Sequence, residues 1–123
     1  MCFDKGEWLR PASYRKHLPR PSDTRAEVVA KSKRRSLYYP GVDVSSLEEA
    51  AAKRGRYLDS TGGPTIHKVQ EMERDIGASE GEPSRWLLVE STSGTYHGYP
   101  ITEARYRKWL QKTRECCNEN ETG

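Results

Sequence analysis

The feature that most constrains the fold is a β-hairpin pattern in the second half of the chain. Arg85–Ser91 contains an uninterrupted apolar run, and Thr95–Tyr99 is rich in Thr and Tyr. Both compositions favour strands. Ser93 and Gly94 lie between the two segments, and glycine tolerates the positive φ that a tight hairpin turn requires. We therefore predict a small antiparallel sheet around residues 85–99.

The core must be built from few apolar side chains. Only 33% of the 123 residues are hydrophobic and 32% are charged, whereas an average domain is about 25% charged. The length fits one domain. Because the chain has one Phe but three Trp and seven Tyr, these larger aromatic residues must supply much of the core. Because a core this thin gains stability when a partner surface covers apolar residues, a homodimer stays open as a prediction.

Helix signals lie on both sides of the hairpin. The first predicted helix covers about residues 22–33, where Thr24 and Glu27 have the spacing of a capping box. The last covers about residues 102–114, with Thr102 as its N-cap. The sequence therefore places one helix well before the sheet and one directly after it.

A second N-terminal helix is predicted over about residues 46–54, where alanines and a leucine form a narrow apolar face. Gly55 follows it and suits a left-handed C-terminal position. Two Ser–Glu pairs have capping-box spacing at its start: Ser45 with Glu48, and Ser46 with Glu49.

The segment from Thr65 to Ile76 has two interpretations. Its apolar residues recur at helical spacing, with Pro64 near the start and Gly77 after the end, which favours a helix. The alternative is a strand that pairs with the hairpin. With the helix preferred, the predicted fold class is α+β, with N-terminal helices, a small antiparallel sheet around residues 85–99 and a C-terminal helix.

The organisation predicted along the chain is an arm, a domain and a tail. Residues 1–21 contain three prolines and are expected to form an irregular N-terminal arm. Residues 22–115 are expected to form a single compact domain. Residues 116–123 have little to bury and are expected to be a disordered tail.

The three cysteines, Cys2, Cys116 and Cys117, lie near the ends of the chain. An odd count with two adjacent members does not suit a disulfide framework, so we expect a reducing, cytoplasmic compartment. No Cys and His spacing matches a structural zinc site, and we expect neither a metal nor a cofactor. No apolar run approaches the roughly 20 residues of a membrane span, so no membrane partner is expected.

The charge is distributed unevenly and points to a polyanionic partner. Residues 1–58 carry 13 Lys and Arg against 7 Asp and Glu, whereas residues 59–123 carry 8 against 11. Arginines interleaved with aromatic rings can hold single-stranded nucleic acid through phosphate contacts and base stacking. The candidates for phosphate or nucleic-acid binding are Arg34, Arg35, Tyr38, Arg56, Lys68 and Arg85.

A catalytic set is also predicted, with His97 as its first member. In a hairpin centred on Ser93 and Gly94, Glu90 would pair opposite His97, and a Glu–His pair can orient the ring or act as base and acid. His67 is the third candidate. With Arg85 and Lys68 as cations, these residues would supply the base, acid and cation of a metal-independent ribonuclease.

Three functions remain open from the sequence. The preferred prediction is a small basic domain, of the kind found in bacteria and phages, that binds a polyanionic partner, with nucleic acid favoured. The first alternative is a His-dependent, metal-independent ribonuclease of toxin type, since compact bacterial ribonuclease toxins are often basic α+β domains with helices before a sheet. This likeness is one of architecture only. The second alternative is a non-catalytic inhibitor or adaptor that docks on an acidic protein surface.

Overall fold

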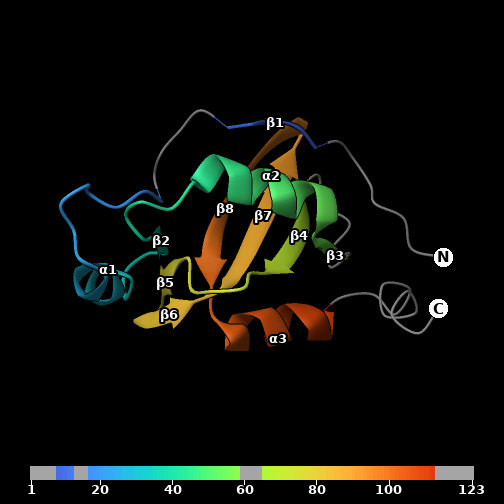
Figure 1. Cartoon of the computed structure of the whole chain (residues 1–123). Coiled ribbons are helices and arrows are strands. Elements are labelled where there is room, and N and C mark those ends of the chain that lie inside the picture. Colours follow the sequence, from blue (N-terminus) through green and yellow to red (C-terminus); the bar gives the residue numbers. More distant parts are fainter. Residues whose placement is uncertain (1–7, 13–16, 59–64, 113–123) are drawn as a thin grey trace.

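The fold is seen in a computed structural model that describes residues 8–12, 17–58 and 65–112 (Figure 1). The helices are α1 (Arg25–Lys31), α2 (Val44–Arg54) and α3 (Glu103–Lys112). The strands are β1 (Trp8–Pro11), β2 (Leu37–Tyr38), β3 (Arg56–Leu58), β4 (Thr65–Glu71), β5 (Gly77–Ser79), β6 (Glu82–Ser84), β7 (Trp86–Thr92) and β8 (Gly94–Ile101). The three cysteines and the predicted tail at residues 116–123 lie outside the described residues.

The strands form two sheets (Figure 1). The larger has five strands in the order β1-β8-β7-β4-β3, and the smaller has three in the order β2-β5-β6. β1 runs parallel to β8, and the other pairs are antiparallel. One strand of the large sheet, β1, therefore comes from the segment that was expected to be an irregular arm.

The predicted fold class is wrong. The described residues form three helices and eight strands, about 29% helix and 39% strand, and the five-stranded sheet dominates rather than a small sheet around residues 85–99. The helices before the hairpin are also not clearly N-terminal, because strands precede, separate and follow them. Strands of two to four residues caused most of the error, because segments this short carry too little alternation to be recognised in a sequence.

The helix preferred for residues 65–76 is wrong for a different reason. Thr65–Glu71 is the strand β4, which pairs along its whole length with β7. Ile66 and Val69 have helical spacing, but in the strand they point to opposite faces, as alternation requires. Pairing with β3 on one side and β7 on the other decides the structure here, and strand preference depends strongly on such context.

The hairpin itself is confirmed. β7 and β8 pair from Trp86 opposite Ile101 to Thr92 opposite Thr95. Ser93 and Gly94 form the turn with φ of 55° and 87°. A two-residue loop with both φ values positive matches the right-handed twist of the strands it joins.

Two of the three predicted helix starts are confirmed. Thr24 and Glu27 form the capping box of α1, and the Thr102 hydroxyl accepts a hydrogen bond from the Arg105 amide at the start of α3. These caps satisfy backbone donors that the first turn of a helix leaves without partners.

The helix α2 ends at Arg54 as predicted, but its predicted N-cap and the predicted left-handed conformation of Gly55 are wrong. The N-cap is Asp43, whose side chain accepts from the Ser46 amide, so neither predicted Ser–Glu box forms. Gly55 has extended backbone angles (φ −66°, ψ 156°). A Cβ at Gly55 would lie 2.4 Å from the Ala51 carbonyl oxygen, so close packing on α2 explains this glycine.

The large sheet is covered by a helix on each face. α2 packs through Ala51 on the face that carries Leu87 and Val89. α3 packs on the opposite face, where Leu88 and Ile101 are buried. α1 instead packs on the small sheet through Val28, Leu37, Tyr39 and Ala78.

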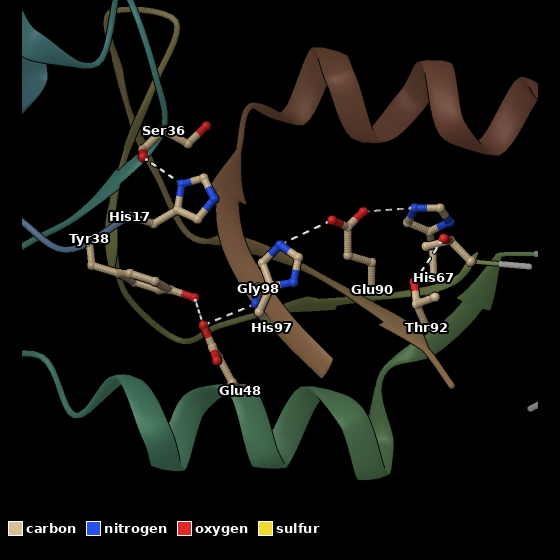
Figure 2. A network of polar contacts seen from close by, with 10 residues as sticks. His17, Ser36, Tyr38, Glu48, His67, Glu90, Thr92, His97 and Gly98 are labelled. Atoms are coloured by element: carbon tan, nitrogen blue, oxygen red, sulfur yellow. Dashed lines mark hydrogen bonds and ion pairs between the residues drawn. The ribbon is translucent and has the colours of Figure 1, made fainter. Parts of the chain in front are cut away.

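A buried carboxylate joins α2 to both sheets. Glu48 is only 8% exposed, and its Oε2 accepts from the Tyr38 hydroxyl at 2.7 Å and from the Gly98 amide at 3.0 Å (Figure 2). Tyr38 belongs to β2 and Gly98 to β8. The side chain expected to cap a helix therefore connects three elements of the core.

Replacing Glu48 by Ala should destabilise the protein by about 2–4 kcal/mol, because two buried donors would lose their acceptor. Urea unfolding followed by circular dichroism measures this change. Glu49→Ala is the matched control, since Glu49 lies on the exposed side of the same helix and pairs with Lys53. Equal stability changes for the two variants would contradict the role assigned to Glu48.

Candidate functional site

Three polar side chains form a line across the face of the large sheet that α3 covers. In the strand register, Glu90 of β7 lies between His67 of β4 and His97 of β8. Residues paired in this way project to the same face of a sheet. His67 Nε2 lies 3.2 Å from Glu90 Oε2, and His97 Nε2 lies 3.0 Å from Glu90 Oε1 (Figure 2). We call these three residues the His–Glu–His row.

The carboxylate of Glu90 is ionised in this arrangement. Hydrogen bonds from His67 and then from His97 hold its pKa well below the usual range, although burial acts in the opposite direction. An ionised carboxylate only accepts hydrogen bonds. His67 therefore donates from Nε2 to Glu90 Oε2, and His97 turns its Nε2 toward Glu90 Oε1 in an ion-pair contact.

The row is shielded but still reaches solvent. The side chains of His67, Glu90 and His97 are 14%, 25% and 15% exposed. The ring of Trp109, from α3, lies 4.5 Å from that of His67. Partial burial strengthens the electrostatic interaction between the three groups, because less water screens them.

His17 covers the other end of the row. Its ring is nearly parallel to that of His97, with 6.0 Å between centroids (Figure 2). His17 Nδ1 donates to the Ser36 carbonyl at 3.0 Å, and its ring stacks on Tyr99 at 4.9 Å. His17 is thus fixed on two sides where it meets His97.

Tyr99 lies two residues beyond His97 on the same face of β8. Burial, with the charge of Glu90 as a second cause, raises its pKa to about 12, while Arg105 opposes this rise. At neutral pH Tyr99 therefore carries a hydroxyl that can donate a hydrogen bond. The same residue connects the row to the cations beside it.

The predicted catalytic residues are brought together, but two predicted cations are not. Lys68 lies on the opposite face of the sheet from His67, buried to 3% exposure, where its Nζ donates to the Ala52 carbonyl at 2.8 Å. It also lies over the Trp8 ring. Strand alternation separates Lys68 from its neighbour His67, so its ammonium group does not reach a phosphate placed at the row.

Tyr38 and Arg85 are also remote from the row. Tyr38 is 1% exposed and hydrogen-bonded to Glu48 inside the core, so it offers no surface for base stacking. Arg85 precedes β7 and faces Asp75, with 4.0 Å between Nε and Oδ1. Five residues of strand separate it from Glu90, roughly 16 Å at the usual rise.

The other three predicted cations, Arg34, Arg35 and Arg56, lie nearer to the His–Glu–His row. Arg56 pairs with Val69, two residues along β4 from His67. Arg34 and Arg35 follow α1 and line a pocket that Tyr99 and Arg105 also line. The sequence could not reveal this last grouping, because it joins a turn near residue 35 to the first turn of α3.

No family model, no curated protein and no solved structure matches this chain. The chemistry of the site therefore follows from its own residues. In the part of the chain that the structure describes, no three His, Cys, Asp or Glu side chains are grouped so as to hold a metal ion. None of the described helices is long and apolar enough to cross a membrane.

Replacing Glu90 by Gln should destabilise the protein by about 1–3 kcal/mol at pH 7, because hydrogen bonds to a charged acceptor would be lost. The pKa of Glu90 is lower in the folded state than the unfolded value of about 4.3. Its stabilisation is therefore complete above that value and is lost as pH falls through the lower, folded pKa. The difference in the free energy of unfolding between wild type and Glu90→Gln should therefore narrow as pH drops below about 4.

Urea unfolding at several pH values between 7 and 2 measures this difference. Glu82→Gln, at an exposed position of β6, is the control and should leave the stability nearly unchanged. If wild type and Glu90→Gln differ by the same free energy of unfolding at every pH from 7 to 2, Glu90 is not ionised in the row as described.

Proposed function

We propose that this protein cleaves RNA without a metal ion, by general acid–base catalysis at the His–Glu–His row. The observation that carries the proposal is the direct contact of one carboxylate with two histidines, 3.2 Å and 3.0 Å away. RNA contributes its own nucleophile, the 2′-hydroxyl. A base, an acid and a source of positive charge are then sufficient for the reaction.

The proposed step is an internal transfer of the phosphodiester. One histidine, neutral at Nδ1, accepts the 2′-hydroxyl proton while O2′ forms a bond to phosphorus. The other histidine, doubly protonated, donates a proton to the departing 5′-oxygen as its bond to phosphorus breaks. The products are a 2′,3′-cyclic phosphate and a free 5′-hydroxyl, and the number of protons on the two rings is conserved.

Glu90 acts as a positioning residue in this mechanism. By accepting from Nε2 of both rings, it fixes their orientation and stabilises whichever ring is protonated, as a carboxylate does for a catalytic histidine in hydrolases. One imidazolium and one carboxylate have no net charge between them. The charge of the phosphate must therefore be met by cations outside the row.

Binding of nucleic acid without cleavage is the second candidate. The observation that favours it is the convergence of Lys33, Arg34, Arg35 and Arg105 on one pocket, in a chain whose first half has the excess of basic residues. A cytoplasmic location belongs to both proposals, because RNA is abundant there. A non-catalytic adaptor for an acidic protein surface lacks a comparable observation.

The test is incubation of the purified protein with end-labelled single-stranded RNA and with DNA of the same sequence. Wild type should cleave RNA in the presence of EDTA, leave DNA intact and produce a 2′,3′-cyclic phosphate end. His97→Ala and His67→Ala should each lower the rate at least 100-fold, since a positioned acid or base contributes roughly 10²–10⁴-fold. Arg85→Ala should cleave at the wild-type rate.

Circular dichroism shows whether each variant is folded, and only folded variants are compared. RNA that stays intact with wild type but shifts on a native gel would replace cleavage with binding. RNA that neither shifts nor is cleaved would overturn both proposals and leave an acidic protein as the partner to seek. Cleavage that persists in both histidine variants would assign the activity to other residues or to a contaminant.

A further inference from the structure

A basic pocket lies beside the His–Glu–His row, between the end of α1 and the start of α3. Its cations are Lys33, Arg34 and Arg35 from the turn after α1 and Arg105 from the first turn of α3. Tyr99 forms part of its wall. The hollow encloses about 130 Å³, which is room for a phosphate group, since a single water occupies about 30 Å³ in the liquid.

The charges in this pocket are unbalanced. One carboxylate, that of Glu80, lines it with the four cations, and this carboxylate accepts from the Thr102 hydroxyl at 3.2 Å. No ion pair links Lys33, Arg34, Arg35 or Arg105 to an acidic side chain among the described residues. Like charges brought together in a hollow raise the local positive potential, which an anion would relieve.

The pocket and the row share a wall. The Tyr99 ring lies 6.2 Å from that of His97 and 4.9 Å from that of His17, centroid to centroid. Ser36, which also lines the pocket, accepts the His17 Nδ1 hydrogen bond through its carbonyl. A chain that places one phosphate at His97 can thus reach the pocket by passing over Tyr99.

We propose that the basic pocket is a phosphate subsite that holds a neighbouring phosphate of single-stranded RNA while another lies at the row. This inference deepens the proposed ribonuclease activity and rests on it for the choice of RNA. The subsite replaces Lys68 and Arg85 as the source of positive charge. Arginine suits the role because its planar fork binds two phosphate oxygens at once. The Tyr99 hydroxyl is a further donor in the same wall.

The test measures binding separately from cleavage, with a fluorescent 2′-O-methyl RNA oligonucleotide that lacks the nucleophile. Anisotropy titrations compare wild type with the triple variant Arg34→Ala, Arg35→Ala, Arg105→Ala. The matched control removes the same charge elsewhere, at the exposed positions Arg20, Arg54 and Arg74. The pocket variant should weaken binding at least 10-fold more than the control does. The slope of log affinity against log salt concentration should also become shallower by about 0.7, the contribution of roughly one lost phosphate contact on a single strand.

The outcomes separate the subsite from the catalytic proposal. Equal weakening by both triple variants would overturn the subsite, because net charge alone would then explain binding. Absence of binding to wild type would also overturn it. Loss of cleavage in His97→Ala with unchanged anisotropy would support both proposals, whereas pocket-dependent binding by a wild type that does not cleave would support the subsite and refute the ribonuclease.

A second arm distinguishes RNA phosphate from free phosphate. Inorganic phosphate is added to wild type and to the pocket variant while the amide NMR signals of Ser36 and Tyr99, which both proteins retain, are followed. Shifts in wild type only, at phosphate concentrations far above those of RNA, would support a subsite for polymer phosphate. Equal shifts in the two proteins, or tighter binding of free phosphate than of RNA, would overturn it.

Discussion

The register of the central strands β4, β7 and β8 is the constraint on which the site depends. It sets Glu90 opposite both histidines, and a slip of one residue would move a side chain to the other face. The Ser93–Gly94 turn fixes one end of the hairpin. Gly98 adds a close contact inside the sheet, because a Cβ there would lie 2.9 Å from the Leu88 carbonyl oxygen and 2.7 Å from the Val89 side chain.

The polar side chains on the two faces of this sheet lie in different surroundings. On the α2 face, Glu48 and Lys68 are buried and hydrogen-bonded to backbone groups, so these side chains connect α2 to the strands. On the α3 face, the charge of Glu90 meets two titratable rings that remain partly exposed. A buried carboxylate serves stability in the first case, whereas in the second a half-buried carboxylate contacts the two rings that we propose as base and acid.

Local signals in the sequence predicted the hairpin, the pairing of Glu90 with His97 and the caps at Thr24 and Thr102. Each of these depends on a few neighbouring residues. For residues 65–71 the sequence leaves helix and strand both open, because the apolar spacing suits a helix; pairing with β7 decides for the alternative, the strand. The basic pocket could not be predicted, since its cations come from two segments far apart in the sequence that meet only in the folded chain.

The central claim is that two histidines, held by one carboxylate, act as base and acid on RNA. The most direct measurement is the pH dependence of kcat/KM for cleavage of a single-stranded RNA oligonucleotide. We expect a bell-shaped profile, because one ring must be neutral and the other protonated in the free enzyme. A profile with a single ionisation, or a rate independent of pH, would contradict it.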